Sequence, residues 1–298
     1  MLTFNPVKLE DKAWVDPIVF AEDSRSAGFN FGNMYMWSGN GRHRITRLGD
    51  RLLIMLCYGP VPAFVFPIGS GELLPAVEAL REYAQENGIP FILRGLTAAH
   101  VDELKLACPG QFSFEEMREY FDYVYAAEAL ATLAGKKLHG KRNHINRFEM
   151  AYDWHFEPLT KEHFPACLEL LKSWEDEENH ENTADEHTAI LRGFNAWDEL
   201  KLEGGTLFAG DRLVAFTAGE KTSSDTFDVH FEKAYRDVNG AYPTVNREFV
   251  RLILQRHPEI LYINREEDMG HENLRLAKQS YNPLFLVEKS TARWLGDA

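Results

Sequence analysis

The chain has 298 residues, 45% of them hydrophobic and 26% charged, a composition typical of a folded protein long enough for two domains. Its formal net charge of −14 disfavours non-specific nucleic-acid binding, because a phosphate backbone attracts surplus Lys and Arg. Cys57, Cys108 and Cys167 lie far apart without a CxxC pair, which argues against a disulfide framework and a thiolate zinc site. No export signal opens the sequence, so we expect a cytoplasmic protein.

An uncharged stretch, Leu52–Gly71, has nearly the length of a membrane-spanning helix, but prolines interrupt it. The turn-forming segment Gly59–Pro62 separates two strand-like runs, Leu52–Cys57 and Ala63–Pro67. We therefore expect a buried β-hairpin here and no transmembrane segment.

A short repeat marks the organisation of the chain. Gly49-Asp50-Arg51-Leu52 recurs as Gly210-Asp211-Arg212-Leu213, and each copy joins two strand-like runs. The same strand, helix, strand, helix, strand order follows each copy. In the first half these elements are Ala63–Pro67, Glu72–Glu86, Pro90–Leu93, Ala98–Ala107 and Phe121–Tyr125. In the second half they are Thr226–Glu232, Ala241–Arg256, Ile260–Ile263, His271–Ser280 and Leu284–Glu288.

This repeated order predicts an α/β protein with two tandem domains and mixed central sheets. It resembles the GNAT (acyl-CoA N-acyltransferase-like) fold, with another mixed α/β fold built on a β-meander as the alternative. We expect an N-terminal GNAT-like domain over residues 1–133, a basic linker helix over 134–150 and a C-terminal GNAT-like domain over 151–298.

The junction between the halves is basic within an acidic protein. It carries five cations and no acid between residues 134 and 148: Lys136, Lys137, Lys141, Arg142 and Arg147. A local tRNA contact and a solvated or internally paired linker helix both fit this pattern.

Two longer segments, Phe121–Phe148 and Ile263–Pro283, resemble the DUF2156 family, as do the shorter runs Phe231–Ala234, Asn239–Pro243 and Asn246–Phe249. That family is similar to the C-terminal catalytic domain of bacterial lysylphosphatidylglycerol synthases. The resemblance implies a tandem GNAT arrangement and transfer of an acyl or aminoacyl group to an amine or hydroxyl, from an acyl-CoA or aminoacyl-tRNA donor. The alternative is a non-catalytic binder of a small anionic or zwitterionic ligand on the same scaffold.

The strand Thr226–Glu232 carries the first set of candidate site residues. Side chains alternate along a strand, which predicts Asp228, His230 and Glu232 on one face. His230 or Glu232 is a candidate base for the acceptor, and Asp228 a candidate substrate ligand. An edge strand with a solvated polar face is the alternative.

A charged loop and the helix after it carry the second set. These candidates for substrate binding are Asn264, Arg265, Glu266, Glu267, Asp268, Arg275 and Lys278. The cations would bind a phosphate or carboxylate, and we expect them to converge with His230 or Glu232 on one cleft. A structural salt-bridge cluster is the alternative. Tyr281 is a candidate proton donor or a core residue.

The segment Arg236–Ala241 stands where GNAT enzymes that use acetyl-CoA carry a glycine-rich phosphate turn. Asn239 and Gly240 are candidate ligands there, but Asn239 replaces the first glycine and Asp237 adds a negative charge, so we expect weak acetyl-CoA binding. We predict no metal site, because no HExxH motif is present and the acid-rich segment Glu175–Glu186 has no common ligand spacing.

Overall fold

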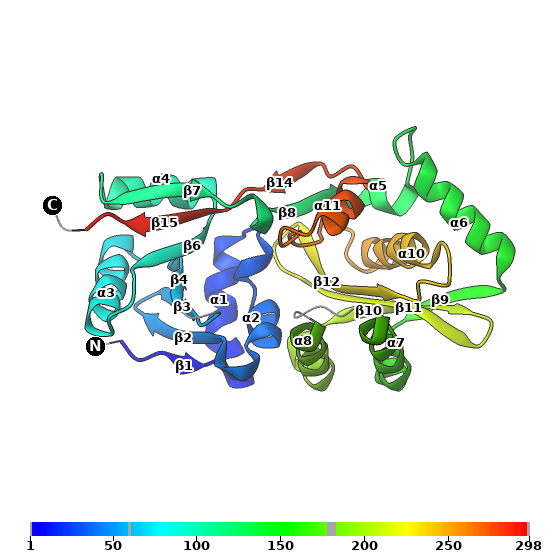
Figure 1. The fold of residues 1–298 in the computed structure, drawn as a ribbon, viewed down its shortest axis with the longest axis horizontal. Coiled ribbons are helices and arrows are strands. Elements are labelled where there is room, and N and C mark those ends of the chain that lie inside the picture. Colours follow the sequence, from blue (N-terminus) through cyan, green and yellow to red (C-terminus); the bar gives the residue numbers. More distant parts are fainter. Residues whose placement is uncertain (1, 59–60, 178–182, 297–298) are drawn as a thin grey trace. The chain divides into compact units, whose positions relative to one another are not determined.

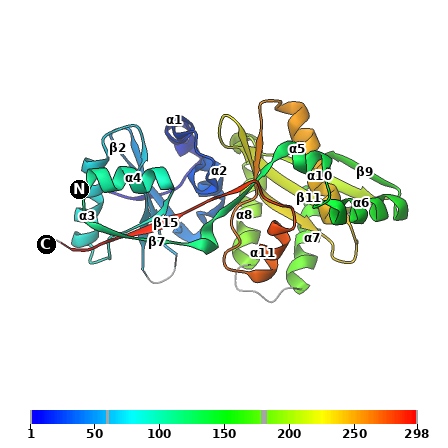
Figure 2. The same cartoon turned by 90° about the horizontal axis from the view of Figure 1, so that it is seen from above.

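The computed structural model describes residues 2–58, 61–177 and 183–296. The chain divides into two compact units, each built on its own mixed sheet (Figures 1 and 2). Unit 1 is Met1–Asp122 with Val287–Ala298, and unit 2 is Tyr123–Leu286. Within the described ranges, no helix has the length and apolar character needed to cross a membrane.

Unit 1 contains a sheet with the strand order β1-β2-β3-β4-β6-β15-β7, and β5 pairs with β3. The strands are β1 (Asn5–Pro6), β2 (His43–Leu48), β3 (Arg51–Leu56), β4 (Ala63–Val65), β5 (Ile68–Gly69), β6 (Ile92–Leu96), β7 (Phe112–Glu116) and β15 (Ser290–Trp294). The α-helices are α1 (Lys12–Glu22), α2 (Phe31–Trp37), α3 (Leu73–Glu86) and α4 (Ala98–Ala107). The expected hairpin is present, because β3 and β4 pair antiparallel.

Unit 2 contains a sheet with the order β14-β8-β13-β12-β11-β10-β9. The strands are β8 (Asp122–Ala126), β9 (Trp154–Pro158), β10 (Glu203–Ala209), β11 (Arg212–Lys221), β12 (Thr226–Ala234), β13 (Tyr262–Asn264) and β14 (Phe285–Val287). The helices are α5 (Ala127–Thr132), α6 (His139–Ala151), α7 (Phe164–Glu177), α8 (Thr183–Asn195), α9 (Trp197–Leu200), α10 (Ala241–Arg256) and α11 (Glu272–Gln279).

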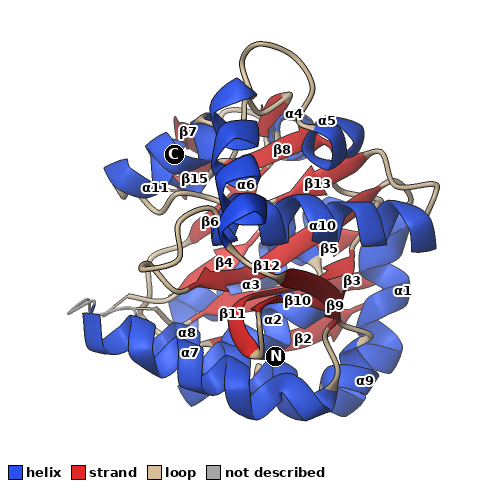
Figure 3. Cartoon of the chain, turned by 90° about the vertical axis from the view of Figure 1, so that its right-hand side faces the viewer, coloured by secondary structure: helices blue, strands red, loops and turns tan. Residues whose placement is uncertain are grey.

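Helix α10 covers one face of the unit 2 sheet, and α7 and α8 cover the other (Figures 1 and 3). The helix buries a stripe at helical spacing that includes Val245, Phe249 and Ile253. Phe249 packs against Phe227 of β12 with ring centroids 5.7 Å apart. Because β12 and β13 run parallel, the α10 crossover delivers the chain from one to the other and places both strand ends at the same edge.

The two halves exchange strands, which the sequence did not predict. The segment expected to close the first half forms β8, which pairs with β13 in unit 2. The C-terminal strand β15 pairs with β6 and β7 in unit 1 (Figure 1). Tyr123 and Tyr125 of β8 are fully buried in the unit 2 core, which explains this assignment. The compact units therefore have different bounds from the expected domains, and the basic segment around α6 lies inside unit 2.

Candidate functional site

A β-bulge in β12 sets the geometry of the site. Ala218 of β11 pairs with Phe231 and Gly219 pairs with Val229, so His230 is an extra residue on β12. A Cβ on Gly219 would lie 1.9 Å from the carbonyl oxygen of Asp228, so only glycine fits this close approach.

The bulge shifts the side-chain alternation after His230. Glu232 points towards α10, where Asn246 donates a hydrogen bond of 2.9 Å to its Oε2 atom. The next residue, Lys233, points to the opposite face and forms a 2.8 Å ion pair with Glu186 of α8. The expected common face of three polar residues is therefore correct for Asp228 and His230 and wrong for Glu232.

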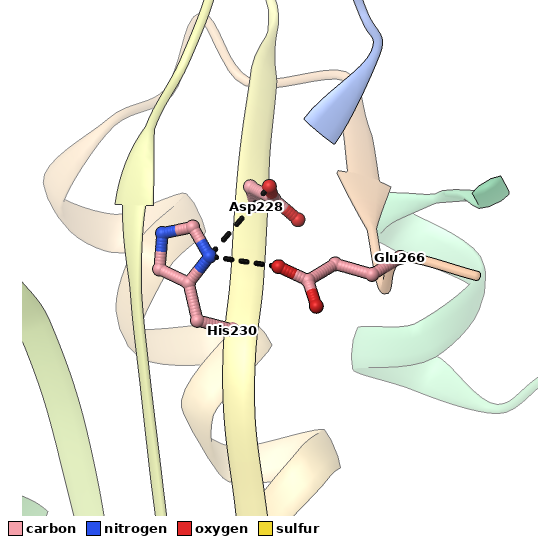
Figure 4. Close-up of side chains that lie close together, drawn as sticks. All are labelled: Asp228, His230 and Glu266. Atoms are coloured by element: carbon pink, nitrogen blue, oxygen red, sulfur yellow. Dashed lines mark hydrogen bonds and ion pairs between the residues drawn. The ribbon is translucent and has the colours of Figure 1, made fainter. Parts of the chain in front are cut away.

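Three carboxylates surround the His230 imidazole. Its Nδ1 atom lies 3.0 Å from Glu266 and 3.7 Å from Asp228 (Figure 4), and its Nε2 atom lies 3.2 Å from Glu220 of β11. The side chains of His230 and Asp228 are fully buried. Burial by itself favours the neutral ring, but the carboxylates outweigh it and hold the pKa of His230 well above its ordinary value.

Glu266 reaches His230 from the loop that follows β13. Its backbone is left-handed, with φ of 56°. Asn264 stabilises this conformation, because its Oδ1 atom accepts a 2.7 Å hydrogen bond from the Glu266 amide. The predicted ligand Asn264 thus shapes the loop.

A second charged group lies where β12 and β13 separate. Asp228 pairs with Asn264 at the end of the parallel ladder, and beyond it Glu232 and Arg265 form a 2.8 Å ion pair. The guanidinium of Arg265 lies 4.8 Å from the ring centroid of Tyr281. Its Nη1 atom is buried and makes no hydrogen bond with the part of the chain that the structure describes.

An open cavity of about 330 Å³ lies at the start of α10. Its lining residues come from α6, from the segment after β12 and from the first turn of α10: Lys141, His144, Tyr235, Arg236, Val238, Asn239, Gly240, Tyr242 and Pro243. These described lining residues include cations but no carboxylate.

Lys141 links the cavity to the ion pair, since its Nζ atom lies 3.9 Å above the Tyr281 ring. Burial, followed by the charge of Arg265, lowers the pKa of Lys141 to about 8. Burial also raises the pKa of Tyr242 to about 12. Tyr281 is buried, and its ring contacts both Lys141 and Arg265. It is therefore both a core residue and a neighbour of the site.

Asn239 and Gly240 lie on the cavity wall. The Oδ1 atom of Asn239 lies 3.0 Å from Nδ1 of His144. Gly240 has φ of +90°, and a Cβ there would lie 2.5 Å from the carbonyl oxygen of His144. The glycine therefore allows α6 to pack against the start of α10.

Arg275 and Lys278 bind the loop instead of facing the cavity. Arg275 forms two hydrogen bonds with Asp268, of 2.9 and 3.0 Å. Lys278 donates to the carbonyl oxygens of Arg265 and Glu267. Of the three cations that were predicted to converge, Arg265 contacts Glu232. Arg275 and Lys278 instead contact residues of the loop itself.

The basic segment is partly paired within the unit. Arg142 donates to the carbonyl oxygens of Leu133 and Gly135, and Lys137 donates to Asn282. Lys136 and Arg147 are exposed.

Sequence reasoning missed Tyr242, Asn246 and Glu220 as individual site residues. The first two occur inside the motifs that carry the family resemblance, so a signal for them was present. Glu220 had none, because its contact with His230 depends on the register of β11 opposite the bulge.

Comparison with known proteins shows the family of the chain. A family model described as phosphatidylglycerol lysyltransferase, C-terminal, matches residues 21–293. The chain belongs to this family. A crystal structure of a conserved protein of unknown function from Bacteroides thetaiotaomicron is 34% identical, with a TM-score of 0.93, over 99% of this chain and 100% of that chain.

More distant structures of similar fold place this member of the phosphatidylglycerol lysyltransferase C-terminal family among tandem GNAT-like proteins. L-PGS from Bacillus licheniformis is 12% identical, with a TM-score of 0.70, over 100% of this chain and 95% of that chain. A tandem GNAT protein from the clavulanic acid biosynthesis pathway is 11% identical, with a TM-score of 0.51, over the whole of both chains.

A curated relative, the uncharacterized protein MYCGA3080 from Mycoplasmoides gallisepticum, is 23% identical over 175 residues. That match covers 56% of this chain and 54% of the relative, so the chain spans about half the length of the curated relative it matches.

Proposed function

We propose that unit 2 transfers an acyl or aminoacyl group to an amine or hydroxyl acceptor. The observation that carries the proposal is the cavity at the start of α10, which is lined by Lys141, His144 and Arg236. Through Tyr281, Lys141 connects this cavity to the Glu232–Arg265 pair. Lys141 of the cavity wall and Arg265 of the buried charged pair thus both contact the Tyr281 ring.

The cavity suits the phosphates that both donor classes carry. Cationic side chains and the N-terminal end of the 16-residue helix α10 favour anions at this place. Asp237, the charge expected to oppose phosphate, instead forms a 3.3 Å ion pair with Arg212 and is not a lining residue. Its repulsion is therefore weaker than the sequence indicated.

The charged pair supplies the groups that transfer requires. Glu232 accepts the proton of the acceptor amine or hydroxyl, which attacks the carbonyl carbon of the donor. The Nη1 atom of Arg265 donates to the oxyanion that develops there. When the bond to the leaving group breaks, the hydroxyl of Tyr242 on the cavity wall gives that group a proton. His230 has no step in this proposal, because its buried ring is held by Glu220, Asp228 and Glu266 on the other face of β12.

An aminoacyl-tRNA is the donor that we favour over acyl-CoA. Asn239 still replaces the glycine of the acetyl-CoA turn. The exposed cations Lys136 and Arg147 flank the cavity residue Lys141 in sequence, which allows a local contact with the tRNA backbone. The family description points to lysine as the aminoacyl group and phosphatidylglycerol as the first acceptor to test.

The test measures binding and transfer separately. The full chain is incubated with labelled lysyl-tRNA and phosphatidylglycerol vesicles, and in parallel with acetyl-CoA and small amines. Arg236→Gln should weaken donor binding about ten- to a hundredfold, the loss of a charge-assisted contact. Arg265→Gln also leaves Glu232 without its partner, so its folding is checked by circular dichroism; the folded variant should keep donor binding and lower transfer about a hundredfold or more. Lys161→Gln, an exposed change away from the cavity, is the control.

Tight donor binding without transfer to any acceptor would favour the non-catalytic binder. Equal donor affinity in the wild type and Arg236→Gln would show that the cavity is not the donor site.

A further inference from the structure

We propose that Asp228, His230 and Glu266 form a binding site for a divalent transition-metal ion. This inference does not rest on the proposed transfer reaction. The three residues come from β12 and from the loop after β13, and Figure 4 shows their side chains directed towards one another. They lie on the opposite face of β12 from the Glu232 contact with α10.

The spacing of the ligand atoms fits a metal ion. One nitrogen and two carboxylate oxygens all lie within 4.8 Å of one another. The Nδ1 atom of His230 is 3.0 Å from Glu266 and 3.7 Å from Asp228. Ligands about 2.0–2.2 Å from a metal stand about 3–4 Å apart, so small side-chain movements would complete the coordination.

Glu220 supplies an independent argument, because it binds the other nitrogen of the ring. Its Oε1 atom lies 3.2 Å from Nε2 of His230, and its Cα lies opposite that of Asp228 in the β11–β12 ladder. A carboxylate that accepts Nε2–H fixes the tautomer in which Nδ1 presents its lone pair to a metal. This carboxylate–histidine arrangement is the usual support of a metal-binding imidazole, and an acidic cluster alone does not provide it.

The donor set selects the class of ion. One imidazole and two carboxylates suit Zn²⁺, Mn²⁺ or Fe²⁺, whereas Mg²⁺ and Ca²⁺ prefer oxygen ligands. The ion would replace the proton on Nδ1 and tie β12 to the loop after β13, where the parallel ladder ends. Glu266 keeps 17% of its side chain exposed, which leaves a side for entry and for a water ligand.

No motif in the sequence predicts this site, because a helix separates its ligands and their spacing matches no common metal-binding pattern. Asp228 and His230 precede α10, and Glu266 follows it. The bulge at His230, and the left-handed backbone of Glu266, bring them together.

The experiment uses the full chain without an affinity tag, dialysed against a chelator and then titrated with Zn²⁺ by calorimetry and with Mn²⁺ by electron paramagnetic resonance. We expect one ion per wild-type chain. Glu266→Gln should abolish this binding, and Glu220→Gln should weaken it about ten- to a hundredfold. Asp237→Asn removes an exposed carboxylate elsewhere in unit 2 and should bind as the wild type does.

Thermal unfolding gives a second readout. Zn²⁺ should raise the midpoint of the wild type and of Asp237→Asn, and leave that of Glu266→Gln unchanged. Far-ultraviolet circular dichroism checks that each variant is folded. Absence of stoichiometric binding to the wild type would overturn the proposal, as would undiminished binding to folded Glu266→Gln.

Discussion

Glu232 of β12 and Arg265, the first residue after β13, form a 2.8 Å ion pair where the two parallel strands separate. Only 8% of the Glu232 side chain and 13% of the Arg265 side chain are exposed. Two charges withdrawn from water in this way depend on each other, because removing one leaves the other buried without its partner.

Glu232→Leu should therefore lower the free energy of unfolding by about 3–5 kcal/mol. Replacing both partners, with Glu232→Leu and Arg265→Met, should cost clearly less than the sum of the two single changes, since no lone charge remains. Urea denaturation of the wild type and the three variants measures this. Strict additivity would show that the two side chains do not depend on each other.

Lys141 should make the stability of unit 2 depend on pH. Burial lowers its pKa from 10.5 in the unfolded chain to about 8 in the folded protein. Between these values the unfolded chain binds more protons at this position, so the contribution of Lys141 to stability rises with pH through this window. The difference in unfolding free energy between the wild type and Lys141→Met should accordingly shift in favour of the wild type from about pH 7 to about pH 10.

Urea denaturation of both proteins across that range measures the difference. A difference that stays constant, or that shifts in favour of Lys141→Met as the pH rises, would contradict the buried position of this amine.

Gly240 should tolerate no larger residue. Gly240→Ala would add both a left-handed non-glycine residue and a Cβ only 2.5 Å from the carbonyl oxygen of His144. Gly210→Ala is a matched control, because Gly210 also has positive φ but open space around its Cβ position. We expect Gly210→Ala to cost about 1 kcal/mol and Gly240→Ala about 1–3 kcal/mol more.

Thermal or urea unfolding of the two variants provides the comparison. If Gly240→Ala and Gly210→Ala lost the same free energy of unfolding, α6 would have to move away from α10 at no cost in stability.

The sequence predicted most of the elements and the tandem fold, because turn residues and hydrophobic periodicity are local signals. It could not predict which sheet receives β8, since Tyr123 and Tyr125 would suit the core of either unit. It also missed the bulge at His230, which moves Glu232 to the other face through the register of β11. Both differences depend on which distant strand lies opposite, which local pattern does not specify.

The sequence alone also could not decide the role of Lys278. Its sequence position allowed either a ligand contact or a structural one, and the structure places its Nζ atom against the carbonyl oxygens of Arg265 and Glu267. The side chain is buried and is not part of the cavity wall.

Lys278→Ala should therefore lower the midpoint of thermal unfolding. The change in that midpoint on addition of CoA should be the same as in the wild type. The substitution removes two charge-assisted hydrogen bonds, and each is worth about 1.5–3 kcal/mol. Lys137→Ala is the control, because that exposed lysine donates to the Asn282 side chain at the surface, so its loss should cost little. Thermal unfolding with and without CoA, used as a soluble phosphate-bearing probe, measures both effects. A stable Lys278→Ala protein whose CoA-induced shift disappears would instead place Lys278 in a ligand site.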